Sequence, residues 1–148
     1  MILSIIQYPD PVLRSLCTPI LEVSKEIKTI INDMYDTLYE ASGRGLAGPQ
    51  IGISNRLFVM DINWKNGISE PVTMINPEIL FKSNETQVNE ERCLSIPETP
   101  VKVERPYTIE VMWMDEECKL NRNRFEGISA AIICHEIDHL DGKLIVDK

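Results

Sequence analysis

The sequence predicts an α+β fold for residues 1–148, taken as a single domain. Three observations support this prediction: a helical pattern at 24–41, several strand-like runs between 56 and 125, and a second helical pattern near the end of the chain at 127–142. Strands grouped between two helices differ from the regular βαβ alternation of a parallel sheet. A chain of 148 residues is long enough to bury the core of one domain.

The first helix begins after Ser24, whose side chain is a good N-terminal cap. The apolar residues that follow recur at helical spacing and are Ile27, Ile30, Ile31, Met34 and Leu38. The glycine-containing segment at 42–45 ends the helix. Ahead of it, Asp10-Pro11 opens a short element of about one helical turn.

The strand-like runs are Arg56–Ile62, Val72–Ile75 and Thr108–Met114. The last of these alternates toward an acidic turn at 115–118, so we expect Lys119–Phe125 to be its hairpin partner. The closing helix then follows directly.

Composition narrows the class of function. The 15 basic and 23 acidic residues give a net charge of −8, which argues against a broad electrostatic grip on nucleic acid. No apolar stretch approaches the roughly 20 residues of a membrane span, so we expect no membrane partner. Met1–Ile6 lacks the basic start of a signal peptide, and we expect a cytoplasmic protein.

The closing helix has the pattern of a metal site. His135 and His139 are four residues apart and share one helix face, with Glu136 beside the first. Two imidazoles can bind one divalent ion while the glutamate takes the proton of a water that the ion activates. A chance His-Glu-x-x-His on a structural helix is the alternative.

A third protein ligand is expected upstream, because only nine residues follow His139 and none is Cys or His. Cysteine is the best candidate, since thiolate binds such metals well. Without a secretory signal the four cysteines are expected as free thiols or metal ligands. Composition does not select among them: they are Cys17, Cys93, Cys118 and Cys134.

Gly43, Gly45 and Gly48 match the spacing of a dinucleotide-binding fingerprint. That fingerprint follows a strand and opens a helix. Here it follows a helical pattern, and Pro49–Gly52 is not expected to open a helix, so we expect no nucleotide. Glycines here can instead allow a substrate backbone to approach closely.

Three motifs, in this order, resemble the peptide deformylase family. They are GRGLAGPQIG at 43–52, ERCLS at 91–95 and HEIDHLDG at 135–142. The N-terminal YPDPVLR at 8–14 is also similar to the family.

The resemblance implies that Cys93, His135 and His139 are the metal ligands and that Glu136 is the general acid and base. It implies Gln50 and the backbone N–H of Leu94 as donors to the oxyanion. It also implies strands packed around a central C-terminal helix that carries HEIDH. One divalent ion per chain is implied, with Fe²⁺ favoured over Zn²⁺, Ni²⁺ or Co²⁺, all of which suit these donors.

The chain departs from the family pattern in three places. Arg92 stands where the family usually has glycine: it can swing to solvent, narrow the cleft or recognise a different substrate end, and Glu90 or Glu91 can hold it away from the metal. Gly48 replaces an alanine, which removes only a methyl group. The chain also stops at Lys148 without a further C-terminal helix, which bears on any transient association with the ribosome.

The resulting prediction is a metal-dependent hydrolase that removes the formyl group from N-formylmethionyl peptides of nascent proteins and releases formate. One alternative is a weak or silent deformylase-like metal-binding protein, suggested by Arg92, and another is a zincin-like peptidase. A Glu91–Arg105 ion pair is expected to brace the second motif, with two solvated surface charges as the alternative. The residues expected at the substrate cleft are Gly43, Gly45, Glu91, Arg92, Ile128 and Ile132.

Overall fold

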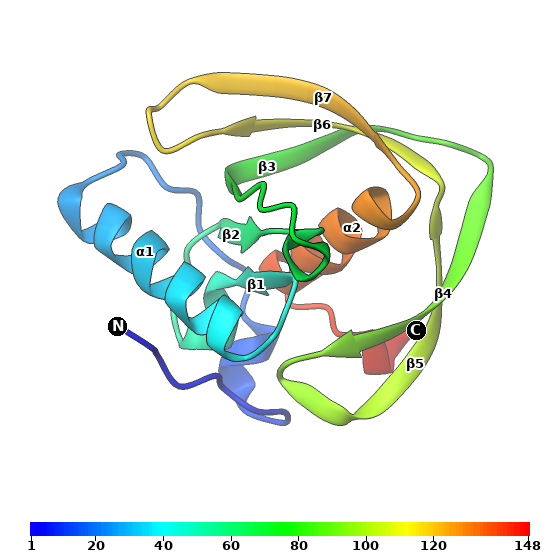
Figure 1. Cartoon of the computed structure of the whole chain (residues 1–148), viewed down its shortest axis with the longest axis horizontal. Helices are drawn as coiled ribbons and strands as arrows, with labels where there is room; N and C mark the ends of the chain where they lie inside the picture. The colour runs from blue at the N-terminus through cyan, green and yellow to red at the C-terminus, as the bar shows by residue number, and fades with distance from the viewer.

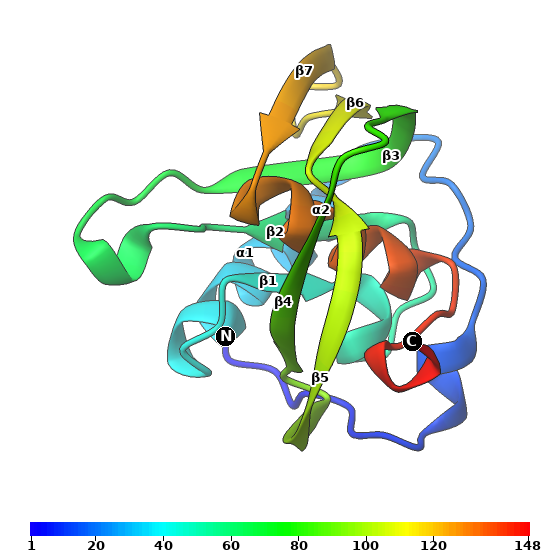
Figure 2. The same ribbon diagram turned by 90° about the vertical axis from the view of Figure 1, so that its right-hand side faces the viewer.

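A computed structural model describes residues 1–148, and a C-terminal helix lies at its centre (Figure 1). This helix, α2 (Ile128–Leu140), contacts both a five-stranded sheet of order β1-β2-β3-β6-β7 and the separate β4–β5 pair. Figure 2 shows the β4–β5 ribbon crossing in front of α2. The expected α+β arrangement, with strands around the HEIDH helix, is confirmed.

Helix α1 (Lys25–Glu40) forms where the apolar spacing predicts it. The Ser24 side chain accepts a hydrogen bond from the N–H of Ile27 at 3.2 Å, which caps the first turn. One face packs on the sheet residues Leu46, Leu57, Val59 and Ile75. The predicted short turn is also present as the 3-10 helix η1 (Pro11–Arg14).

The predicted strands are present, with different lengths in two cases. Strand β2 (Leu57–Met60) is shorter than expected, whereas β3 (Val72–Lys82) extends well beyond Ile75. The hairpin of β6 (Thr108–Met114) and β7 (Leu120–Glu126) is confirmed, and its register pairs Thr108 with Glu126.

Two parts of the chain differ from the sequence prediction. The hairpin of β4 (Thr86–Cys93) and β5 (Ile96–Pro106) was not expected, nor was the short β1 (Gly45–Ala47). The expectation that no helix opens at Pro49 was wrong, since the 3-10 helix η2 spans Gly48–Ile51. Two further 3-10 helices are η3 (Trp64–Asn66) and η4 (Ile145–Asp147).

The main core joins α2 to the larger sheet. Ala130, Ile133 and Leu140 pack with sheet residues that include Phe58 and Val111. Gly127 starts the helix with φ +61°, which suits glycine. None of the helices is long and apolar enough to cross a membrane.

Candidate metal centre

The second and third sequence motifs meet at one buried point. Cys93 is the last residue of β4, and His135 and His139 lie one turn apart on α2. The Sγ of Cys93 is 3.3 Å from Nε2 of His139, and one ligand atom from each residue lies within 4.8 Å of the other two. The structure therefore brings together the three donors that the family resemblance implies.

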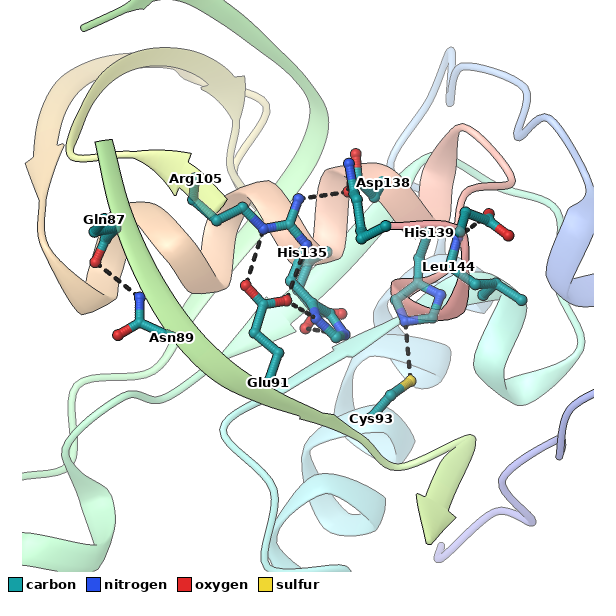
Figure 3. Close-up of polar contacts among 12 residues, drawn as sticks. Gln87, Asn89, Glu91, Cys93, Arg105, His135, Asp138, His139 and Leu144 are labelled. Atoms are coloured by element: carbon teal, nitrogen blue, oxygen red, sulfur yellow. Dashed lines mark hydrogen bonds and ion pairs between the residues drawn. The ribbon is translucent and has the colours of Figure 1, made fainter. Parts of the chain in front are cut away.

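A buried ion-pair network orients His135 (Figure 3). The carboxylate of Glu91 on β4 accepts a hydrogen bond from Nδ1 of His135 at 2.9 Å. The guanidinium of Arg105 on β5 donates to both oxygens of the Glu91 carboxylate at 2.9 Å each, so Oε1 is shared between Arg105 and His135. Arg105 also donates to Asp138 on α2 at 2.5 Å. The network leaves Nε2 of His135 free to face the Cys93–His139 pair, as second-sphere carboxylates do for metal-binding imidazoles.

This network shows whether Glu91 and Arg105 form an ion pair or remain two solvated charges. Both side chains are almost fully buried, at 9% and 4% exposure, so the ion pair predicted from sequence is confirmed and the solvated alternative is wrong. Burial raises the pKa of Glu91, but the Arg105 and His135 contacts outweigh it and lower that pKa to about 2.

Glu136 lies beside the three donors and is buried. Its Oε1 has no hydrogen-bond partner in the protein, and its Oε2 is 4.0 Å from Nε2 of His135. Burial raises the pKa of its carboxyl to about 7. A carboxyl poised near neutrality with a free oxygen is suited to accept and return a proton.

The glycine of β1 creates the space for this carboxylate. A Cβ placed on Gly45 would lie 2.5 Å from Oε2 of Glu136. Similarly, a Cβ on Gly43 would lie 2.7 Å from Cδ1 of Leu94. These two glycines therefore admit side chains of the protein itself against the β1 segment.

The two histidines are electrostatically different. Burial lowers the pKa of His135, but the charge of Glu136 and hydrogen bonds with Cys93 and Glu91 outweigh it and raise that pKa to about 10. Burial, with the charges of His135 and Arg105, lowers the pKa of His139 to about 3. Both rings bind a cation only in the neutral form.

The donor set fits a divalent transition ion. One thiolate and two imidazoles around an ion at typical bond lengths are separated by roughly 3.5 Å, close to the observed Cys93–His139 spacing of 3.3 Å. All three donors are buried. Three buried donor atoms that face one another at one point are costly unless they share a cation.

Gln50, the donor implied by the first motif, is buried next to Cys93. Its Oε1 accepts the N–H of Ala47 at 3.0 Å, which fixes the amide, and its Nε2 donates to the hydroxyl of Ser95 at 3.1 Å and lies 3.7 Å from Cys93 Sγ. The N–H of Leu94 donates to no group of the protein. Ser95 was missed by sequence reasoning, although it belongs to the second motif.

A cavity of about 500 Å³ opens beside Cys93 and His135. Five residues of the proposed reaction site line it: Gln50, Cys93, Leu94, His135 and Glu136. All six residues expected at the substrate cleft line it as well: Gly43, Gly45, Glu91, Arg92, Ile128 and Ile132. Ile128 and Ile132 supply apolar surface from α2. Glu91 lines the wall, but its carboxylate is engaged by Arg105 and His135.

Arg92 lies at the mouth of this cavity. Its side chain is 74% exposed, and its one ion-pair contact is with Glu90 at 3.4 Å. The suggestion that Glu91 also holds Arg92 was wrong, because Arg105 occupies that carboxylate. At Gly48, where the chain lacks the methyl group of the family's alanine, a Cβ would lie 2.8 Å from the carbonyl oxygen of Asn55, so the glycine fits a close backbone contact.

The other cysteines lie outside the cluster. Cys17 and Cys134 are buried in the main core, and burial raises the pKa of each thiol to about 11. Cys118 is exposed in the β6–β7 turn. No disulfide is formed, which agrees with the expectation of free thiols.

Comparison with known proteins identifies the family. The family model described as "Polypeptide deformylase" matches residues 2–148. A peptide deformylase of Afipia carboxidovorans is 45% identical over 143 residues, covering 97% of this chain and 84% of the relative. One of Thermotoga neapolitana is 43% identical and covers 95% and 83%.

Solved structures agree. A peptide deformylase from Thermotoga maritima matches with a TM-score of 0.94 and 41% identity, covering 100% of this chain and 97% of that one. One from Synechococcus elongatus in complex with actinonin matches with a TM-score of 0.94 and 37% identity, covering 98% and 79%. These similarities favour the deformylase prediction over a silent metal-binding protein or a zincin-like peptidase. The chain belongs to the polypeptide deformylase family.

Proposed function

We propose that this protein hydrolyses the formyl amide of N-formylmethionyl peptides, releasing formate and a free amino terminus, at the Cys93–His135–His139 cluster. The observation that carries the proposal is this buried set of three donors, with Glu136 beside it, at the edge of a cavity in a member of the polypeptide deformylase family. We take residues 1–148 as one domain that contains the whole site.

Cys93, His135 and His139 would hold one divalent ion, with Fe²⁺ favoured and Zn²⁺, Ni²⁺ or Co²⁺ accepted by the same donors. When bound, such an ion supplies Lewis-acid chemistry, which makes water acidic enough to attack at neutral pH and polarises a carbonyl. The Glu91–Arg105–Asp138 network supports this set by fixing the His135 ring.

Glu136 moves the proton. Its unpartnered Oε1 accepts the proton of the attacking water, and the same carboxyl then gives it to the leaving amine. A carboxyl whose pKa is raised to about 7 by burial can exist in both forms during one turnover.

Gln50 and Leu94 stabilise the negative charge that develops on the formyl oxygen. The Gln50 amide is fixed by Ala47 and Ser95, so its N–H group is held in place before substrate arrives. The N–H of Leu94 is free to donate. Preorganised donors of this kind each contribute roughly 10²- to 10³-fold in rate.

The substrate enters the 500 Å³ cavity. Ile128 and Ile132 present apolar surface to the methionine side chain, while Gly43 and Gly45 line the cavity and leave room for the side chains of Leu94 and Glu136 beside it. Glu91 and Arg92 complete the wall beside Cys93. Formylated nascent chains are made in the cytoplasm, and we propose that the protein acts there, with transient association with the ribosome bringing it to its substrates.

A formate-release assay tests the proposal. The protein is loaded with Fe²⁺ under reducing conditions and given a formyl-Met tripeptide and its acetyl-Met counterpart. We expect formate from the first and no hydrolysis of the second or of internal peptide bonds. Cleavage of internal bonds would support a peptidase, and absence of turnover in metal-loaded protein would support a silent metal-binding protein.

A further inference from the structure

We propose that the cations at the cavity mouth make this protein select formyl-Met peptides with an acidic side chain at the second or third residue. The inference rests on the proposed function and assigns Arg44, Lys65 and Arg92 as specificity-determining residues. All three line the cavity that Cys93, His135 and Glu136 also line, although the chain as a whole carries a net charge of −8.

The three cations are available to a ligand. The Arg44 side chain is exposed and has no hydrogen-bond or ion-pair partner in the protein. Lys65 is exposed and lies 5.9 Å above the Trp64 ring. Arg92 has only the long Glu90 contact at 3.4 Å. None of the three is used to hold the fold together.

The acids that line the same cavity offset them only in part. Glu90 is half exposed and neutralises some of the Arg92 charge. Glu91 is already paired with Arg105, and Glu136 is buried next to His135. The exposed charge at the mouth is therefore three positive and one negative.

The fold fixes two of these cations together on one wall. The indole N–H of Trp64 donates to the carbonyl of Gly43 at 2.8 Å, and the N–H of Asp61 donates to the carbonyl of Arg44 at 2.9 Å. These bonds hold the η3 turn, and Lys65 with it, against the Gly43–Gly45 segment. Arg92 is on β4, in the second wall.

Their distance from the reaction centre sets which substrate residues they meet. Arg92 directly precedes the ligand Cys93, and Arg44 directly precedes Gly45, which touches Glu136. Consecutive Cα atoms are about 3.8 Å apart, and an extended peptide advances about 3.3 Å per residue. Because the three cations line the same cavity as Cys93 and Glu136, a substrate that extends from this centre passes them with the first residues after the formyl-methionine.

The test measures kcat/KM for amidated formyl-Met tripeptides that differ in one residue: aspartate, alanine or lysine at the second or the third position. Amidation removes the terminal carboxylate, so only the varied side chain carries charge. The ionic strength is set near 0.15 M, where charges beyond roughly 8 Å are screened. At one position at least, we expect the aspartate peptide to exceed the lysine peptide by about threefold or more.

The triple variant Arg44→Gln/Lys65→Gln/Arg92→Gln should reduce this ratio to about one, mainly by raising KM for the aspartate peptide. The control variant Lys25→Gln/Lys28→Gln/Lys119→Gln removes three exposed cations outside the cavity. Each variant changes the net charge from −8 to −11, so long-range effects are matched. The control should keep the wild-type ratio.

Three results would overturn the inference. The first is a wild-type ratio of one or below at both positions while the alanine peptides are hydrolysed, which would leave the proposed function intact. The second is an equal loss of selectivity in the control variant, which would assign the effect to overall charge. The third is no formate from any peptide, which would overturn the proposed function and this inference together.

Discussion

Replacing Arg105 with leucine should reveal how much the buried network beneath the metal centre contributes to stability. Arg105 is 4% exposed, and its guanidinium makes both of its Glu91 contacts at 2.9 Å. In Arg105→Leu the Glu91 carboxylate stays buried, with Nδ1 of His135 as its remaining side-chain partner. An uncompensated buried charge of this kind costs about 3–5 kcal/mol of unfolding free energy.

The pKa of Glu91 gives a second measure of the free energy that this network contributes. Its fall from 4.5 to about 2 corresponds to about 3 kcal/mol of net interaction with the charged carboxylate, supplied by Arg105 and His135 together. For a chain of this size, a loss of about 3–5 kcal/mol lowers the midpoint of thermal unfolding by roughly 6–20 °C. Denaturant unfolding at pH 7, in protein saturated with metal, measures the same difference with an unchanged slope.

The matched control is Arg122→Leu, which removes an arginine 64% exposed from its pair with Glu110. That exposed pair should contribute no more than about 1 kcal/mol. A double variant, Glu91→Leu/Arg105→Leu, removes both charges and should recover much of the lost stability. If Arg105→Leu cost no more than Arg122→Leu, or if the double variant were the least stable of all, the reasoning about a buried pair would be refuted.

Three further outcomes are expected. Glu136→Gln should retain its metal and lose at least about 100-fold in kcat, because only proton transfer is removed; near-normal turnover with bound metal would exclude its role. Gly45→Ala should lose about 1–3 kcal/mol of stability and most of its activity, since the new methyl would lie 2.5 Å from Glu136 Oε2; an unchanged kcat/KM would show that the carboxylate can move. Burial raises the pKa of Asp61, but hydrogen bonds from Tyr39, the Glu70 N–H and Ser69 outweigh it and lower that pKa below 3.8. Asp61 therefore stabilises the fold above pH 3.8 and loses this contribution as pH falls through its folded pKa, so the stability difference between wild type and Asp61→Asn should shrink on acidification; a difference independent of pH down to 2 would contradict this.

Local patterns in the sequence were enough to predict much of the fold. The Ser24 cap with its apolar spacing predicted α1, and alternation around the 115–118 turn predicted the β6–β7 hairpin. The β4–β5 hairpin was missed because most inward positions of β4 are polar, at 87, 89 and 91, while Val88 points outward and is exposed. In addition, β5 contains three prolines, at 97, 100 and 106, which weaken a strand prediction. Its pairing is nevertheless continuous from Thr86 with Pro106 to Glu91 with Val101.

The residues of the candidate site were predicted from the sequence better than the contacts that hold them in place. His135, Glu136 and His139 follow from helical spacing, whereas selecting Cys93 needed the family resemblance. The contact between Glu91 and His135 joins residues 44 positions apart, and the one between Gln50 and Ser95 joins residues 45 apart. Such contacts are set by how the β4–β5 hairpin packs against α2 and η2, which no local pattern encodes.

The central claim is that Cys93, with the two histidines, holds the ion at which the formyl group is removed. Its most direct test is the metal content and formate release of Cys93→Ala, measured beside Cys134→Ala, which removes a buried thiol outside the cluster. We expect Cys93→Ala to lose both its metal and its activity after dialysis, while Cys134→Ala retains both. A full metal complement with normal formate release in Cys93→Ala would contradict the account.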